Sequence, residues 1–221
     1  KLGEVSLKNF QFEKYSQALE KIKQKEPIYG NAFILCANKV FGYEKKHQNH
    51  LALLDMVFSK REIAKQLISS RTLKELFERL LELPLMGNFM AYQISIDFNY
   101  SEVFNFNEND FTIAGPGAER GIRKCFIDTG GKSSEYVIKY MTDNQEREFN
   151  RLGIKFKDLF GRPMHAIDCQ GWFCELDKYS RVKFPQLKSN RTKIKAKYKP
   201  SEERINLFYP PKWRINENIH I

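Results

Sequence analysis

Hydrophobic positions recur along most of the chain at the spacing of an α-helix. Residues 72–81 give the clearest pattern, with apolar side chains at i, i+3, i+4, i+7 and i+8 on one face. Thr72 and Glu75 have the spacing of a capping box at the start of this helix, and Pro84 ends it. The apolar stripe consists of Leu73, Leu76, Phe77, Leu80 and Leu81.

Weaker patterns of the same period predict helices over 10–25, 51–58, 60–68, 89–97, 134–152 and 169–182. Residues 38–50, after an apolar run at 32–37, and residues 99–114 are predicted as loops, with one short strand at 111–114, and glycines punctuate 115–131. We therefore expect a mostly α fold with few short strands. The expected domains are a helical domain over 1–182 and a basic C-terminal arm over 183–221.

Charge sets the C-terminal arm apart from the rest of the chain. The 221 residues carry 37 Lys and Arg against 27 Asp and Glu, a net charge of +10. Residues 183–214 hold ten basic and two acidic side chains, with aromatic residues between them, so they contribute +8 of that charge. Clustered basic groups with aromatic rings predict contacts to nucleic acid, with Arg191, Lys193 and Lys195 on the phosphates. The alternative is a solvated tail that contacts no partner.

Several classes of protein are excluded at this stage. No apolar run approaches the roughly 20 residues that cross a bilayer, so we expect no membrane association. The four cysteines include no Cys-x2-Cys pair, which predicts reduced thiols rather than a disulfide scaffold or a metal site. We expect no metal and no cofactor, no identifiable protein partner, and a cytoplasmic location in a bacterial or phage-infected cell.

The string Leu-Pro-Leu-Met-Gly-Asn-Phe-Met-Ala at 83–91 joins two predicted helices through a tight turn. It resembles the helix-hairpin-helix motif of DNA glycosylases, although Leu85 stands where that motif has its first glycine. Free amides after Gly87, at Asn88, would face a DNA phosphate at the start of the second helix. The alternative is an ordinary helical corner.

In helix-hairpin-helix glycosylases a catalytic aspartate follows the hairpin by about twenty residues, and Asp110 lies 23 positions after Gly87. A carboxylate there would stabilise positive charge on the sugar as the base departs. Lyase-type members carry a lysine where this chain has Phe89, so the resemblance implies no β-lyase activity.

A glycine cluster at 114–125 is the most distinctive string of the chain. Gly115 and Gly117 flank Pro116 at a helix start, and the basic residues that follow favour a phosphate ligand; the alternative is a tight turn before a basic helix. Those basic residues are Arg120, Arg123 and Lys124. A Walker-type kinase loop at 130–133 is excluded, because Phe126 stands where its first glycine is needed.

The predicted helix after residue 165 combines charged and aromatic side chains. Asp168, Glu175 and Lys178 share one face, with Trp172 between them. Acids in such a setting are either ion-paired structure or chemistry, and Glu175 with Lys178 has the spacing of a simple pair.

Four strings together resemble the α-glutamyl/putrescinyl-thymine pyrophosphorylase superfamily, which includes the helical domain joined to 5-hydroxymethyluracil DNA kinases. They are GNFMAYQI at 87–94, DFNY at 97–100, NDFTIAGPGA-x-RG at 109–121 and IDCQ-x-x-x-CE-x-x-KY at 167–179. The resemblance implies a DNA-glycosylase-like helical fold that acts on hypermodified bases in phage and bacterial DNA. The matched positions are Gly87, Tyr92, Gln93, Asp110, Gly115, Gly117, Arg120, Asp168, Gln170, Glu175, Lys178 and Tyr179.

The resulting hypothesis is a monofunctional DNA glycosylase that excises a modified base from DNA. Asp110 would be the catalytic acid, with Asp168 or Glu175 as the second carboxylate. The base pocket would be formed by Tyr92, Gln93, Gln170, Trp172 and Tyr179, and Lys178 would join the DNA-binding residues. Two alternatives remain open: a transferase that displaces pyrophosphate from an activated thymine in DNA, and a non-catalytic reader of modified DNA.

Overall fold

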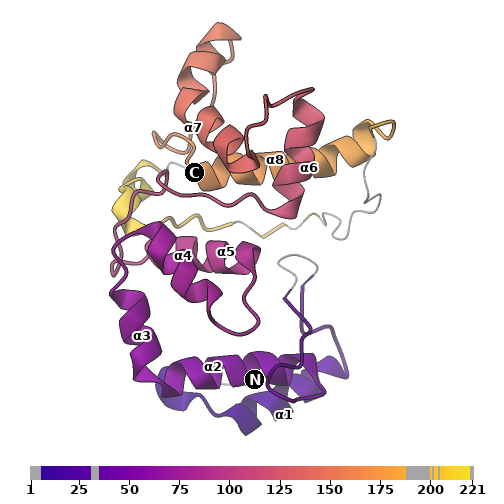
Figure 1. The fold of residues 1–221 in the computed structure, drawn as a ribbon, viewed down its shortest axis with the longest axis vertical. Helices are drawn as coiled ribbons and strands as arrows, with labels where there is room; N and C mark the ends of the chain where they lie inside the picture. Colours follow the sequence, from indigo (N-terminus) through magenta and orange to yellow (C-terminus); the bar gives the residue numbers. More distant parts are fainter. Residues whose placement is uncertain (1–5, 31–34, 188–199, 201, 204, 220–221) are drawn as a thin grey trace. The chain divides into compact units, whose positions relative to one another are not determined.

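A computed structural model describes residues 6–30, 35–187, 200, 202–203 and 205–219 (Figure 1). In these residues the fold is mostly α, as the hydrophobic pattern predicts. The helices are α1 (Phe12–Lys23), α2 (Lys46–Ser59), α3 (Arg61–Ile68), α4 (Leu73–Leu81), α5 (Asn88–Asn99), α6 (Pro116–Cys125), α7 (Ser134–Arg151) and α8 (Ala166–Lys183). Three short 3-10 helices complete them: η1 (Leu7–Asn9), η2 (Pro211–Trp213) and η3 (Asn216–Asn218).

The described residues contain no β-strand, only an isolated bridge between Leu159 and Arg162. The short strand expected at 111–114 is therefore not formed. Residues 46–50, expected in a loop, instead form the first turns of α2, where His47 is buried. None of the helices in the described part of the chain combines the length and the apolar character needed to cross a membrane.

Half of the capping box expected at the start of α4 is formed, because Glu75 bonds to the Arg71 amide instead of the amide of the N-cap residue Thr72. The Thr72 hydroxyl accepts a hydrogen bond from the Glu75 amide at 3.0 Å, and a Glu75 carboxylate oxygen accepts one from the Arg71 amide at 2.7 Å. The apolar stripe of α4 is buried at Leu73, Leu76, Phe77 and Leu80. Local capping and a continuous apolar face thus explain this helix.

The turn between α4 and α5 contains Leu85 in the left-handed region, with φ of 66°. Glycine adopts this conformation without strain, whereas other residues pay roughly 1–2 kcal/mol. Leu85 therefore keeps the backbone that a glycine would have at this position of the resembled motif. Whether the turn binds DNA as a helix-hairpin-helix does stays a prediction.

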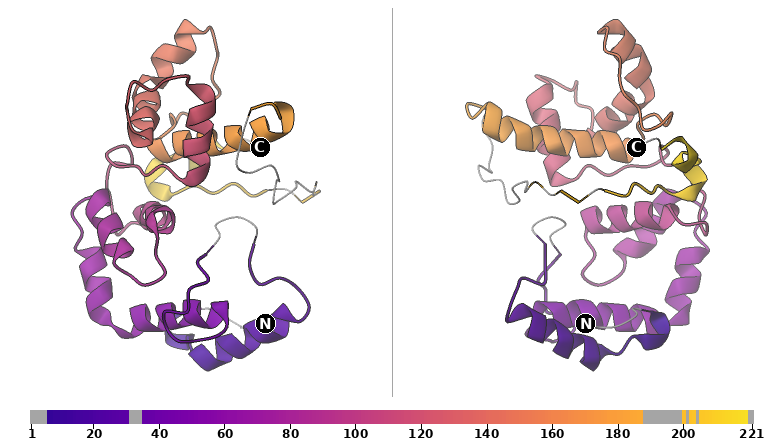
Figure 2. Two further views of the ribbon diagram at one scale, coloured as in Figure 1. Left: turned by 45° about the vertical axis from the view of Figure 1, so that its right-hand side comes forward. Right: turned by 180° about the vertical axis from the view of Figure 1, so that it is seen from behind.

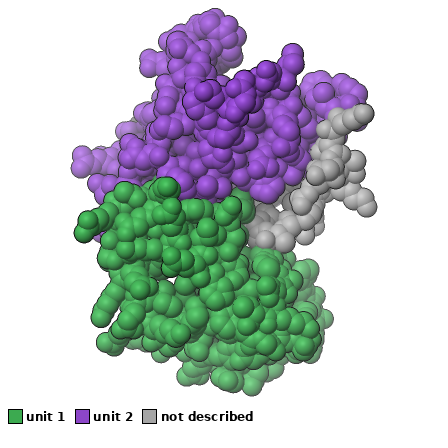
Figure 3. Space-filling model, in the orientation of Figure 1, with its two compact units in different colours: residues 1–91 green, residues 92–221 purple. Residues whose placement is uncertain are grey.

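The chain divides into two compact units, residues 1–91 and 92–221 (Figure 3). The division does not coincide with the expected boundary at residue 182, because the C-terminal segment 205–219 belongs to the second unit together with α6, α7 and α8. In the first unit α1 packs beside α2, as the two views of Figure 2 agree.

In the second unit α6 and α8 share the largest interface between two helices. Two glycines of α6 make this close approach possible. A Cβ atom on Gly121 would lie 2.0 Å from the Phe173 carbonyl oxygen, and one on Gly117 would lie 2.4 Å from the Cys174 sulfur. The core around this crossing is formed by Ala114, Ile122, Val137, Ile138, Ala166 and Cys169. The glycines of the cluster at 114–125 therefore have a packing role.

Candidate functional site

The second unit contains a group of paired polar side chains at the start of α8, two of them buried and three half-buried, which we call the Glu108 cluster. Its members come from four separate segments: the loop after α5, the loop before α8, the first turn of α8 and the C-terminal η2. They are Glu108, Arg162, His165, Asp168 and Trp213. Because burying charge is costly, these groups must satisfy one another.

Glu108 is the acid at the centre of this cluster, and its side chain is only 6% exposed. One carboxylate oxygen, Oε2, lies 2.9 Å from His165 Nδ1 and 3.4 Å from Arg162 Nη2, while Oε1 accepts a hydrogen bond from Trp213 Nε1 at 2.7 Å. Burial raises the pKa of Glu108, but the hydrogen bonds from His165 and Trp213 and the nearby positive charges lower it more, so the pKa lies below its ordinary value. Glu108 is therefore ionised at neutral pH.

Arg162 joins the two acids of the cluster. Its Nη1 atom donates to Asp168 Oδ2 at 2.8 Å, and the guanidinium carbon lies 3.8 Å from the centre of the Trp213 ring. The side chain is 6% exposed, and its buried Nε atom has no hydrogen-bond partner. The positive charge is thus held by two carboxylates and one aromatic face.

The start of α8 fixes His165 and Asp168 in place. Asp168 Oδ2 accepts a hydrogen bond from the His165 amide at 2.8 Å, and Asn109 Oδ1 accepts one from the Ala166 amide at 2.9 Å. Amides at a helix N-terminus lack partners within the helix, and these two oxygens supply them. Asn109 follows Glu108 directly, so the same loop caps α8 and delivers the buried acid to His165.

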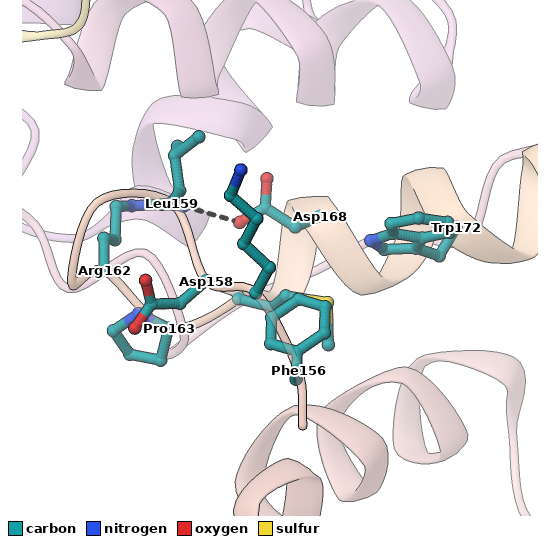
Figure 4. Close-up of a pocket in the computed structure, with 9 residues that line it drawn as sticks. Phe156, Asp158, Leu159, Arg162, Pro163, Asp168 and Trp172 are labelled. Atoms are coloured by element: carbon teal, nitrogen blue, oxygen red, sulfur yellow. Dashed lines mark hydrogen bonds and ion pairs between the residues drawn. The ribbon is translucent and has the colours of Figure 1, made fainter. Parts of the chain in front are cut away.

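A pocket of about 200 Å³ opens beside Arg162 and Asp168 (Figure 4). One wall is the loop at 156–164, which turns tightly at Phe160 and Gly161, both with positive φ. The other wall is α8, from which Asp168 and Trp172 face the pocket one helical turn apart. The remaining lining residues are Phe156, Lys157, Asp158, Leu159, Pro163 and Met164. Ligand pockets usually measure roughly 300–1,000 Å³, so this one suits a single ring or a small substituent.

The paired Glu108 and His165 have the arrangement of a carboxylate that orients an imidazole. An ionised Glu108 favours a proton on His165 Nδ1, which leaves Nε2 as the nitrogen that can take a proton from another group. The imidazole is 22% exposed, in contrast to the deeply buried acid behind it. The geometry can therefore support general-base chemistry.

Within the part of the chain that the structure describes, no group of three or more His, Cys, Asp or Glu side chains could hold a metal ion.

A second buried charge lies between α6 and α8. Asp177 is 0% exposed, and its carboxylate lies 3.0 Å from Arg120 Nε, 2.7 Å from Lys124 Nζ and 3.5 Å from Arg181 Nη2. Burial raises the pKa of Asp177, but the hydrogen bonds from Lys124 and Arg120 lower it by more, so the pKa lies below its ordinary value. This ion-pair group holds the two helices together.

The structure separates the three acids that were predicted to be catalytic. Asp110 is exposed on the loop after Glu108, so it lies outside the buried cluster. Asp168 belongs to the Glu108 cluster and lines the pocket. Glu175 is exposed on α8 and pairs with Lys178. A catalytic role for any of them stays a prediction. Of the three acids, only Asp168 lines the pocket.

Of the predicted base-pocket residues, Trp172 lines the pocket. Tyr92 is fully buried, and its hydroxyl donates a hydrogen bond to Thr112 Oγ1 at 3.1 Å. Burial raises the pKa of Tyr92 to about 12, so Tyr92 is a core residue. Gln170 is also buried, Gln93 is half-buried, and Tyr179 is exposed. These four do not line the pocket.

The predicted DNA-binding residues have different environments. Arg120 and Lys124 are turned to Asp177, whereas Gly87, Asn88 and Arg123 are exposed. Gly115 is the buried residue that precedes α6. Arg191, Lys193 and Lys195 lie outside the described residues. Contact of these residues with DNA stays a prediction.

Four members of the Glu108 cluster were missed from sequence: Glu108, Arg162, His165 and Trp213. Two signals pointed to them. His165 stands three residues before Asp168, the spacing of a capping box, and Trp213 is one of only two tryptophans, placed after two prolines. Nothing local distinguishes Glu108 from its polar neighbours.

Comparison with known proteins identifies the relatives of this chain. The family model described as "5-hmdU DNA kinase, helical domain" matches residues 1–189. A protein of Bacillus phage SP10 named "5-hmdU DNA kinase" is 24% identical over 196 residues, which cover 82% of this chain and 30% of that protein. No solved structure matches.

These findings correct the expected activity. The relative is named a kinase, an enzyme that transfers phosphoryl groups, so the expectation of a monofunctional DNA glycosylase that hydrolyses the N-glycosidic bond is wrong. The expected superfamily is confirmed, since its helical domain matches over most of the sequence. By that match, the chain belongs to the family of the 5-hmdU DNA kinase helical domain.

Proposed function

We propose that this chain takes part in the enzymatic modification of hydroxymethylated uracil bases in DNA, as a transferase that acts on the activated 5-methylene substituent. The observation that carries the proposal is the family match over residues 1–189. The relative's name places 5-hydroxymethyluracil DNA in this family, and the net charge of +10 suits a DNA substrate. The chain spans 30% of that relative, so the activity of the longer protein is carried over here only as part of the proposal.

The proposed reaction is a displacement at the 5-methylene carbon of a base that carries a diphosphate there. An amine nitrogen forms the new bond to this carbon, and the carbon–oxygen bond to the diphosphate breaks. The bonding electrons leave with pyrophosphate. His165, held by Glu108, takes the proton from the attacking nitrogen.

The pocket lined by Arg162 and Asp168 supports the binding of a base beside the Glu108 cluster, although His165 is not among the residues that line it. Trp172 offers an exposed ring for stacking, and Asp168 has a second carboxylate oxygen beside the one that Arg162 and His165 use. Lys157 adds a positive charge at the pocket wall. The diphosphate is not assigned to the glycine cluster at 114–125, because Gly117 and Gly121 are occupied by the close packing of α6 on α8.

The test uses duplex DNA with one diphosphorylated 5-hydroxymethyluracil and a mixture of small amines. After digestion to nucleosides, mass spectrometry is expected to detect an amine adduct, with one pyrophosphate released per adduct. His165→Asn should abolish the adduct, whereas Glu102→Gln, an exposed acid of the same unit, should leave it unchanged. Bound DNA without any adduct or released pyrophosphate would refute the transferase.

A second candidate is a non-catalytic reader of modified DNA. The mutual pairing of Glu108, Arg162 and Asp168 favours it, because such closed networks are also built for stability alone. A reader would bind 5-hydroxymethyluracil DNA more tightly than thymine DNA, form no product, and keep its preference in His165→Asn. Fluorescence anisotropy at two salt concentrations measures this preference.

A further inference from the structure

The C-terminal segment 205–219 lies beyond the residues that the family model matches, yet it enters the Glu108 cluster. Trp213 of η2 reaches Glu108 across 105 positions of sequence. In Figure 2 this segment, coloured yellow, lies by the start of α8. The cluster is therefore incomplete without a part of the chain that lies outside the family match.

Trp213 contacts most members of the cluster. Its indole Nε1 donates to Glu108 Oε1 at 2.7 Å, and its ring lies over the Arg162 guanidinium at 3.8 Å. The His165 ring meets it edge-on with centroids 6.4 Å apart, and Tyr100 meets it edge-on at 5.1 Å. One side chain thus touches the acid, the cation and the imidazole.

The segment is built to hold this indole in place. Asn216 forms two hydrogen bonds with the backbone of Tyr209, both of 2.8 Å, and the Tyr209 ring stacks on Trp213. Ile215 is buried at 5% exposure, and Lys212 Nζ donates to the Phe104 carbonyl at 3.3 Å. A loop fixed at this many points presents Trp213 in one orientation.

Trp213 has a definable effect on Glu108. Its hydrogen bond occupies Oε1, so Oε2 is directed to His165 and Arg162. The same bond helps to lower the pKa of Glu108 against the effect of burial. An ionised, oriented Glu108 is what keeps the His165 proton on Nδ1 and leaves Nε2 able to act as a base.

We propose that Trp213 is a positioning residue of the Glu108 cluster, and that residues 209–216, which hold its indole in place, are an integral part of the site. This inference deepens the proposed function and rests on it for its catalytic consequence. The groups that face Glu108 are His165 from the start of α8, Arg162 from the loop at 156–164, and Trp213 and Lys212 from η2. Tyr92, Tyr100 and Asp168 are further titratable groups around the cluster.

The test compares Trp213→Phe with Phe208→Leu in the full chain. Trp213→Phe keeps an aromatic ring beside Arg162 but removes the indole donor, whereas Phe208 belongs to the same segment and is 77% exposed. In the transfer assay, Trp213→Phe is expected to lower kcat by about tenfold and to leave KM within about twofold, since the loss of one hydrogen bond to a charged group is worth roughly tenfold or more. Its pH profile should shift, and Phe208→Leu should match the parent protein. Equal kcat and an unchanged pH profile for Trp213→Phe would overturn the positioning role.

A second measurement does not depend on any activity. The chain has only Trp172 and Trp213, so its NMR spectrum holds two indole N–H signals, which Trp172→Phe assigns. The Trp213 signal is expected to move in Glu108→Gln, and the His165 ring nitrogens should shift towards the other tautomer in Trp213→Phe. If both signals stay fixed, Trp213 does not position the cluster, whatever the assay gives. If they move while no adduct forms, the transferase reaction fails and the positioning role stands.

Discussion

The crossing of α6 and α8 gives the sharpest test of the fold that carries the site. Replacing Gly121 with alanine would place a Cβ atom 2.0 Å from the Phe173 carbonyl oxygen and 2.7 Å from its carbonyl carbon. Ordinary carbon–oxygen contacts are about 3.3 Å or longer, so the helices must separate by about 1 Å. The clashing atoms belong to the backbone of α8, so no side-chain rotation relieves the contact.

The expected cost follows from two opposed effects. Overpacking of a close-packed interior costs typically about 1–3 kcal/mol, and the upper end applies because a gap of about 1 Å forfeits up to half of each dispersion contact across the interface. Alanine in a helix gains about 1 kcal/mol over glycine. The net loss is then about 2 kcal/mol of unfolding free energy, or roughly 30-fold in the unfolding equilibrium.

Gly171→Ala is the matched control, because Gly171 lies in α8 and a Cβ atom there meets nothing within 4 Å. It should stabilise the second unit by about 0.5–1 kcal/mol. Urea unfolding followed by tryptophan fluorescence measures both variants, since Trp172 and Trp213 both lie in that unit. If Gly121→Ala is as stable as Gly171→Ala, the account of the α6–α8 crossing is refuted.

Three further predictions concern buried charges. Glu108→Gln should lower the free energy of unfolding in urea by about 2 kcal/mol, because Arg162 loses one of its two carboxylates. The control Asp110→Asn, at an exposed acid, should change it by less than about 0.5 kcal/mol. Equal effects of the two variants would contradict the burial of Glu108. Asp177→Asn should lower the free energy of unfolding by about 3 kcal/mol, since three cations lose their carboxylate. Because the pKa of Asp177 is lowered in the fold, its stabilisation is present above the unfolded pKa and is lost as pH falls through the folded pKa. A variant as stable as its parent at pH 7 would refute this. Burial lowers the pKa of His47 from 6.5, so the native state binds a proton at His47 less readily than the unfolded chain does. Thermal unfolding followed by circular dichroism should therefore detect a loss of stability as pH falls below 6.5, and His47→Gln should reduce that loss. The same dependence of stability on pH in both proteins would contradict the role of His47.

Much of the secondary structure and the family could be predicted from sequence, for a local reason. Thr72 with its apolar stripe defines α4 through contacts within a few residues, and such contacts are encoded in spacing. Short strings such as GNFMAYQI carried the family resemblance that the comparison confirmed. The activity inferred by analogy with glycosylases was wrong, because one helical architecture serves several chemistries.

The candidate site depended on contacts that no local pattern encodes. Residues 107–110 read Asn-Glu-Asn-Asp, and only the tertiary structure buries Glu108 while it leaves Asp110 exposed. Glu108 is buried because Arg162, His165 and Trp213 arrive from 54, 57 and 105 positions away to offset its desolvation.

The glycines of α6 make the same distinction. From sequence, Gly117 and Gly121 fit a phosphate-binding loop as well as a close helix contact, because glycine permits both. The backbone of α8 at Phe173 decides between these uses, since it fills the space where a side chain would lie. The sequence by itself therefore determined which segments are helical and which family the chain resembles, although it misplaced the first turns of α2. The pairing of buried charges and the close crossing of helices were decided by tertiary packing, whose energy depends on neighbours distant in sequence.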